Sequence, residues 1–198
     1  MAKRKITKVF INCPFDSDYS NLIRPILFTL LYLGFEPLIA SHRKDSGELR
    51  LKKIVNLISE ADLSIHDISR VQANSPGEFY RLNMPFELGI DWGHREFINK
   101  NKRFLVLAEN SYLAARALSD IAGCDPESHN NEPEEVVRTV RNWLASMDFE
   151  IPDGASYIWG EYNDFLFDLY ELKNHSNEDI KRMPMAEFTK QIKKWTAK

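Results

Sequence analysis

Residues 83–91, with the sequence NMPFELGID, place a carboxylate where it could take part in chemistry. Pro85 suits the first position of a helix because its missing N–H costs nothing there, and Asn83 or Met84 would lie at the cap. Glu87 is then expected in the first turn, where the positive end of the helix dipole favours the ionised carboxylate. A desolvated carboxylate can stabilise the oxocarbenium-like transition state of glycosidic bond cleavage, or attack the anomeric carbon. Glu87 is therefore the candidate catalytic residue; the alternative is that it only complements the helix dipole.

Other polar side chains are candidates for binding a substrate. Asp67, near the end of an apolar segment, could hold sugar hydroxyls or the base, or carry a proton; alternatively it caps the loop that follows. The amides of Asn12 and Asn83 suit ribose or phosphate groups, although asparagine is also common in turns. Asp16 has the alternative role of capping the next helix. The predicted substrate-binding residues are Asn12, Asp16, Asp67, Ser69 and Asn83.

The common cofactor and metal motifs do not occur in the sequence. It contains no G-x-G-x-x-G, no G-x-x-x-x-G-K-[ST], no G-x-S-x-G and no H-E-x-x-H, and its five histidines have no metal-ligand spacing. A standard dinucleotide fold, a P-loop and a serine hydrolase are therefore not expected. We predict no metal and no bound cofactor, with a nucleotide as substrate or ligand.

The elements that must position these residues alternate between strand and helix. Apolar, β-branched segments predict strands at residues 6–12, 36–41, 63–69 and 103–108. Helical periodicity connects them, although Pro25 suggests that the first regular helix begins only near Arg24. This alternation predicts an α/β fold with an open, mostly parallel sheet and helices on both faces. Ligands of such sheets bind outside the carboxyl ends of the strands, where the candidate residues are expected.

The second half of the chain has a different pattern. Pro133 opens an amphipathic helix, residues 157–172 are rich in aromatics and are expected to be helical after Asn163, and a last amphipathic helix contains residues 188–195. No internal repeat or low-complexity linker separates this half from the first. We therefore predict an α/β core over residues 1–123 and a helical extension over residues 124–198 that packs on it.

Composition limits the partners and the cellular compartment that we expect for the protein. The 198 residues are 43% hydrophobic and 28% charged, with a net charge of −3, so no overall basic field points to nucleic acid as a partner. Cys13 and Cys124 form neither a metal pattern nor a disulfide framework, which fits a reducing cytoplasm. The sequence has no apolar run of about 18 residues and no secretory signal, so no membrane association is expected. A homo-oligomer is one use for exposed apolar surface on the helical half.

Two segments in the first half resemble a known family. Residues 61–69 (ADLSIHDIS) and 83–90 (NMPFELGI) resemble the pattern "AD-hydrophobic-D-[IL]-[ST] … N-x-x-[YF]-E-L-G-[IL]" of TIR-like and nucleoside 2-deoxyribosyltransferase-like proteins. The opening VFIN at residues 9–12 also looks like the start of a TIR domain. The resemblance covers about residues 6–108. Met84 and Pro85 depart from the usual pattern, the loop before Asn83 is longer than typical, and nothing after Gly123 has a counterpart.

The resemblance implies a flavodoxin-like fold and a catalytic glutamate that matches Glu87. The implied activity is cleavage of an N-glycosidic bond in NAD or a related nucleotide, in a bacterial protein that acts in antiphage defence. Two alternatives remain open: a nucleotide-sensing module without turnover, and a protein-interaction module of the same fold.

Overall fold

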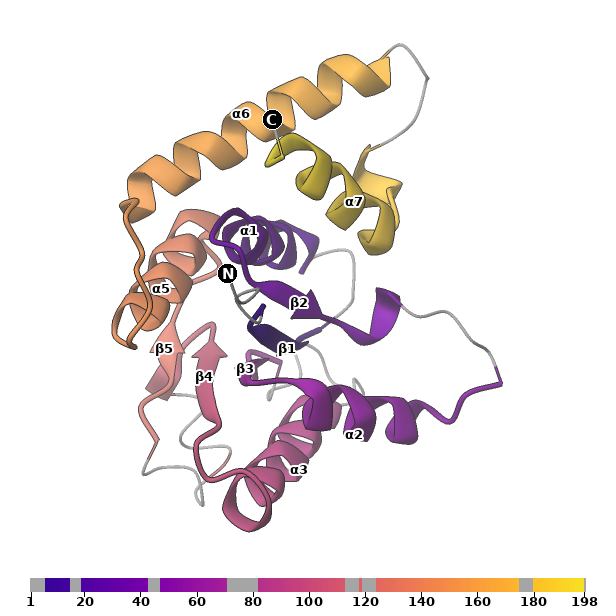
Figure 1. Cartoon of the computed structure of the whole chain (residues 1–198), viewed down its shortest axis with the longest axis vertical. Helices are drawn as coiled ribbons and strands as arrows, with labels where there is room; N and C mark the ends of the chain where they lie inside the picture. Colours follow the sequence, from indigo (N-terminus) through magenta and orange to yellow (C-terminus); the bar gives the residue numbers. More distant parts are fainter. Residues whose placement is uncertain are drawn as a thin grey trace, which may run out of the picture.

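A five-stranded parallel sheet forms the centre of the protein (Figure 1). The computed structural model describes residues 6–14, 19–42, 47–70, 82–112, 118, 124–174 and 180–197. The strands are β1 (Lys8–Asn12), β2 (Glu36–Leu38), β3 (Leu63–Asp67), β4 (Arg103–Ala108) and β5 (Glu127–Ser128). Their order in the sheet is β2-β1-β3-β4-β5, and every neighbouring pair is parallel. The prediction of an open α/β fold of flavodoxin-like type is confirmed.

Helices cover both faces of the sheet. Helices α1 (Ser20–Tyr32) and α5 (Pro133–Ala145) pack on one face, against strand residues such as Ile11 and Ile65. Helices α2 (Arg50–Glu60) and α3 (Asn83–Phe97) pack on the other face, where Phe10 and Val106 point. Successive strand residues thus serve opposite cores, which explains why the central strands are apolar on both faces.

The chain reverses its direction across the sheet at β1. It passes from β1 to its neighbour β2 on one side, and then crosses back to β3 on the other side of β1. The connections that leave β1 and β3 therefore diverge, so the carboxyl ends of these two strands form a topological switch point. In open α/β sheets this is the usual position of a ligand.

Helix α1 begins earlier than the sequence suggested. It extends from Ser20 to Tyr32 with Pro25 inside it, so the expectation of a regular start near Arg24 is wrong. Pro25 removes the single N–H that would bond the carbonyl of Asn21, close to the start of the helix. Every residue from Leu22 to Leu30 is buried, and this burial outweighs the lost hydrogen bond.

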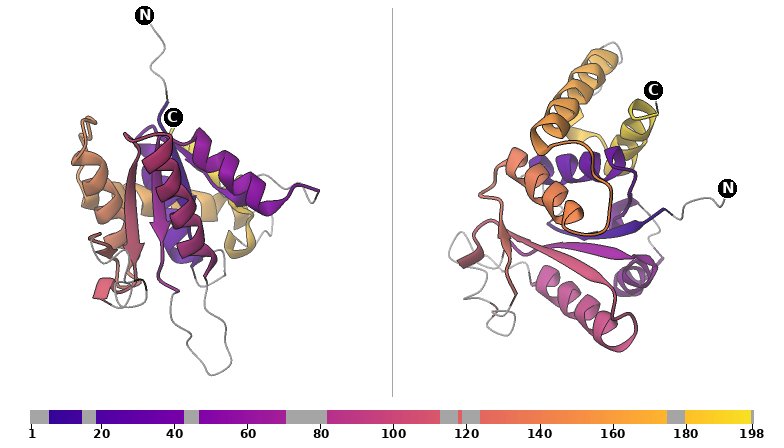
Figure 2. Two further views of the ribbon diagram at one scale, coloured as in Figure 1. Left: turned by 90° about the horizontal axis from the view of Figure 1, so that it is seen from below. Right: turned by 60° about the vertical axis from the view of Figure 1, so that its left-hand side comes forward.

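The remaining helices form an outer layer over α1 (Figure 2). Helix α6 (Ala155–Asn174) starts eight residues before Asn163, where the sequence analysis began it, and α7 (Met185–Trp195) lies beside it. Their aromatic side chains share one core with α1: the ring centroid of Phe165 lies 5.5 Å from those of Phe28 and Phe188. Strand β5 and helix α5, which follow residue 123, continue the sheet and its helical layer.

The structure also bears on two smaller expectations, which concern the length of the second strand and the cysteines. Strand β2 ends at Leu38 and is followed by a 3-10 turn at Ala40–His42, so the predicted strand to residue 41 was too long. Neither cysteine forms a disulfide; Cys13 is buried and Cys124 is partly buried. Within the described ranges, no helix combines the length and the apolar character needed to cross a bilayer.

Candidate functional site

The predicted site residues lie near the carboxyl ends of β1 and β3, but on two faces of the sheet. Asn12 is paired in register with His66, so Asp67 is the next residue along the neighbouring strand. Because side chains alternate along a strand, Asn12 points to the face covered by α3 whereas Asp67 points to the face covered by α1 and α5. The candidate residues therefore form two groups instead of the single cluster that the sequence suggested.

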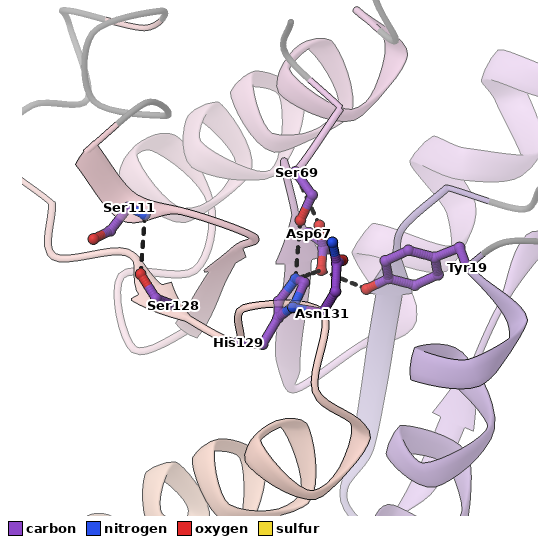
Figure 3. Close-up of polar contacts among 7 residues, drawn as sticks. All are labelled: Tyr19, Asp67, Ser69, Ser111, Ser128, His129 and Asn131. Atoms are coloured by element: carbon purple, nitrogen blue, oxygen red, sulfur yellow. Dashed lines mark hydrogen bonds and ion pairs between the residues drawn. The ribbon is translucent and has the colours of Figure 1, made fainter. Parts of the chain in front are cut away.

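Asp67 is the centre of the first group, shown in Figure 3. Its side chain is completely buried. Oδ1 accepts a hydrogen bond from the backbone N–H of Ser69 at 2.8 Å. Oδ2 accepts one from the hydroxyl of Tyr19 and lies 3.0 Å from Nε2 of His129. Both carboxylate oxygens are thus engaged by the protein itself, and Asp67 ties the start of α1, the end of β3 and the loop after β5 together.

The contacts of His129 define its tautomer. Its Nδ1 accepts a hydrogen bond from the backbone N–H of Asn131 at 3.1 Å, so the ring proton lies on Nε2. Nε2 is also the atom that approaches Ser69 Oγ, at 2.9 Å, and Asp67 Oδ2. In a Ser-His-Asp triad the serine and the aspartate contact different ring nitrogens. Here they share one nitrogen that carries a proton, so His129 has no lone pair with which to activate Ser69.

A strained turn holds His129 in this position. The backbone N–H of His129 donates to the carbonyl of Ala108 at 3.0 Å, which continues the pairing of β5 with β4. Asn130 and Asn131 then adopt φ angles of 51° and 59°, in the left-handed region that asparagine tolerates better than most residues. The turn closes when the N–H of Glu132 donates to the carbonyl of His129 at 2.8 Å. Strain of this kind is common near functional sites.

Sequence reasoning missed His129 and Tyr19 as members of this group. The spacing of the histidines along the chain gives no sign of this role, and a strand of two residues such as β5 is too short to produce a periodic pattern. One signal was present: two adjacent asparagines follow His129, and Glu132 separates them from Pro133, the start of α5. Such a pair is typical of a tight turn that fixes the residue before it.

Asn12 begins the second group, a chain of buried polar residues between the sheet and α3. Its Nδ2 donates to the carbonyl of Met84 at 2.9 Å and to Nδ1 of His66 at 3.1 Å. Nε2 of His66 lies 3.0 Å from Oδ2 of Asp91, and Oδ1 of Asp91 lies 2.7 Å from Nζ of Lys102. All four polar side chains are buried. Oδ1 of Asn12 has no hydrogen-bond partner within the described segments.

The charges in this chain follow from burial and pairing. Burial lowers the pKa of His66, and the hydrogen bond that it donates to Asp91 only partly opposes this. Burial alone would raise the pKa of Asp91, but the hydrogen bonds from His66 and Lys102, together with the charge of Lys102, outweigh it, so the pKa is lowered. His66 is therefore neutral and donates from Nε2 to an ionised Asp91. Lys102 supplies the countercharge and also donates to the carbonyl of Ile58 at 2.6 Å.

Glu87 lies two residues further into the helix than expected. Helix α3 begins at Asn83, with Leu82 as its cap residue, so Pro85 is the third helical residue and Glu87 the fifth. The expectation that Pro85 opens the helix and that Glu87 lies in its first turn is wrong. Proline is tolerated throughout the first turn, because none of the N–H groups there has an intrahelical acceptor.

The environment of Glu87 differs from that of the two aspartates. Only 5% of the residue is exposed, yet its one partner in the described chain is Arg50, whose Nη2 lies 3.8 Å from Oε1. Arg50 is the first residue of α2, and 63% of its side chain is exposed. Burial raises the pKa of Glu87, and the charge of Arg50 opposes that rise. A nearly buried carboxyl group whose one partner in the described chain is a largely exposed arginine is a candidate for function.

The other predicted residues are placed less tightly. Asn83 is exposed at the first position of α3, and Ser69 is partly buried beside His129. Asp16 lies outside the described residues. Within the described segments, no group of three or more histidine, cysteine or acidic side chains could hold a metal ion.

Comparison of the chain with protein-family models gives no match, and comparison with curated proteins gives none. The functional interpretation therefore depends on the residues of the site.

Proposed function

We propose that the protein cleaves the N-glycosidic bond of NAD or a related nucleotide, with Glu87 as the reacting carboxylate. The observation that carries the proposal is the state of Glu87: nearly buried, with a raised pKa and only the exposed Arg50 as its partner in the described chain. The starts of α2 and α3 both follow carboxyl ends of strands, which is where this fold binds ligands. The resemblance of residues 61–69 and 83–90 to TIR-like and deoxyribosyltransferase-like proteins supports the same activity.

In this mechanism Glu87 acts on the anomeric carbon of the ribose. The bond between that carbon and the base nitrogen breaks, and its electron pair leaves with the base. The carboxylate stabilises the positive charge that develops on the sugar, or forms an ester with it that water then hydrolyses. A desolvated carboxylate is effective in this role because little water screens its charge. Arg50 favours the ionised form of Glu87, and its exposed guanidinium is available to a phosphate of the same nucleotide.

Two asparagines support this arrangement. Asn12 holds the carbonyl of Met84 and thereby positions the first turn of α3, one turn before Glu87. We assign Asn12 as a positioning residue and Asn83, which is exposed on the same turn, as a contact for the ribose or phosphate. The enzyme would work in the cytoplasm, in keeping with two cysteines that form no disulfide, and its proposed setting is bacterial antiphage defence.

The test is release of the base from NAD. The protein is incubated with NAD and with deoxynucleosides, and free base is measured by chromatography. Glu87→Gln should lower the rate about a thousandfold, as expected when a reacting carboxylate is removed. Glu171→Gln, an exposed residue of α6, is the matched control and should retain the wild-type rate. Equal rates for Glu87→Gln and wild type would refute the mechanism.

A second candidate function is nucleotide binding without turnover. The contacts of Asp67 and His129 favour this function, because both side chains are already hydrogen-bonded to each other and to backbone N–H groups. Neither is therefore available as a second acid or base in the described part of the site. Calorimetry distinguishes the two functions. Binding of NAD without release of base, in wild type and in Glu87→Gln alike, would support the binding module.

A further inference from the structure

A groove of about 710 Å³ lies at the opposite edge of the sheet, at the amino end of β4. It is bordered by the end of α3, the short connection to β4 and the end of α5. The residues that line it are Arg95, Lys100, Asn101, Lys102, Arg103, Phe104, Trp143, Ser146 and Met147. Four of these residues are cationic and none is acidic, although the chain as a whole has a net charge of −3.

Two of the four cations are available to a ligand, and a third is held beside them by its neighbours. Lys100 and Arg103 are exposed, and neither has a partner among the described residues. The guanidinium of Arg95 lies 4.5 Å from the ring centroids of both Trp92 and Phe104, so its position is fixed by stacking. The fourth cation, Lys102, is buried, and its ammonium group is occupied by Asp91 at 2.7 Å.

We propose that this groove binds the phosphate groups of a nucleoside triphosphate. Several separate cations suit a ligand whose negative charges are spread along a chain, and arginine forms paired hydrogen bonds with phosphate oxygens. The partly buried side chains of Phe104, Trp143 and Met147 give the base an apolar surface. The volume falls within the range of about 300–1,000 Å³ that is typical of small-molecule sites. This site is separate from Glu87, and its existence does not depend on the proposed enzymatic activity.

Glu96 makes the proposal more specific. Its Oε1 lies 3.0 Å from Nη2 of Arg95, so it competes with any anion for that guanidinium. Glu96 is exposed, and replacing it removes a negative charge from the border of the groove. Glu96→Gln should therefore strengthen nucleotide binding, whereas a loss of binding would contradict the assignment of Arg95 as a ligand-binding residue.

The experiment uses the full chain and adenosine triphosphate labelled with a fluorophore on the ribose, with binding followed by fluorescence anisotropy. Reversing two charges of the groove, in Lys100→Glu/Arg103→Glu, should weaken binding by at least about tenfold. The matched control Lys190→Glu/Lys194→Glu makes the same charge change on the exposed side of α7 and should stay within about twofold of wild type. Unlabelled tripolyphosphate should displace the probe, because the phosphates supply most of the attraction.

Each other outcome overturns the proposal. If wild type does not bind the probe, the groove is not a nucleotide site. If the α7 control weakens binding as much as the groove variant does, net charge and not the groove is responsible. If Lys100→Glu/Arg103→Glu binds the probe as tightly as wild type, the nucleotide binds elsewhere on the protein and not in the groove.

Discussion

Oε1 of Glu87 and Nη2 of Arg50 are 3.8 Å apart, and they join the second turn of α3 to the first residue of α2. The two partners differ strongly in exposure, because Glu87 is nearly buried whereas most of the Arg50 side chain is in solvent. A contact at this distance, with one partner in water, holds the carboxylate weakly. Arg50 therefore offsets only a small part of the free energy needed to bury the Glu87 carboxylate. This unfavourable free energy affects the stability of the protein and the dependence of that stability on pH.

Glu87→Gln should stabilise the protein at neutral pH. Burial raises the folded-state pKa of Glu87 above its usual value of 4.5, so the native state favours the protonated form. That contribution is present at low pH and is lost as pH rises through the folded pKa, so at pH 7 the ionised group destabilises the native state. Thermal unfolding should give a higher Tm for the variant at pH 7 and a much smaller difference at pH 4. A lower Tm at pH 7 would mean that Glu87 serves the fold.

Arg50→Ala should raise the pKa of Glu87 further. The positive charge of Arg50 lowers that pKa, so its removal leaves burial unopposed. The acidic limb of the pH profile of kcat/KM for base release should move to higher pH, and an NMR titration of the Glu87 carboxyl should show the same shift. Lys52→Ala, another exposed cation on α2, is the control and should leave both curves in place. If the acidic limb of the Arg50→Ala profile matches that of wild type, Arg50 does not influence the ionisation of Glu87 in the reaction.

Asp91→Asn should destabilise the protein by about 3–5 kcal/mol, the cost of leaving a buried charge without its partner. Lys102 is completely buried, and the carboxylate of Asp91 is its countercharge. The lowered pKa of Asp91 contributes stability above its usual value of 3.8, and this contribution is lost as pH falls through the folded pKa. Urea unfolding at pH 7 measures the effect.

Two further variants show whether the loss of stability in Asp91→Asn comes from the unpaired buried charge. The double variant Asp91→Asn/Lys102→Met removes both charges and should recover much of the loss. Asp148→Asn, at an exposed position after α5, should change the free energy of unfolding by less than about 0.5 kcal/mol. If Asp91→Asn costs no more than Asp148→Asn, then the buried pair is not important for the fold.

The sheet could be predicted from the sequence because its strands are short apolar runs between helical segments. Strand β4 occupies residues 103–108 as predicted, and β3 differs only at its end. The same pattern could not show which face each polar residue takes. Asn12 and Asp67 sit at neighbouring strand ends, but register and pleat direct them to opposite faces, and register is a property of the assembled sheet.

The partners of the site residues could not be predicted from the sequence either, because they come from segments that are distant in the chain. Asp67 contacts Tyr19 and His129, which lie 48 and 62 residues away in the chain. One local signal was available for the second group: Glu87 and Asp91 are spaced four residues apart and fall with Met84 and Leu88 on the buried face of α3. Acidic residues on an apolar helix face need buried partners, and Asp91 has them in His66 and Lys102.

Asp67→Asn distinguishes a structural from a ligand-binding role for this carboxylate. Three donors converge on its two oxygens, and an amide would turn its NH₂ group toward at least one of them. We expect a loss of about 1–3 kcal/mol in the free energy of unfolding, measured with urea against Asp148→Asn as control. Tyr19→Phe, which removes one donor and leaves Asp67 with two, should cost less. If the Asp67→Asn variant instead is as stable as wild type but binds NAD more weakly, Asp67 contacts the substrate directly. The lost charge would then affect ligand binding and not folding.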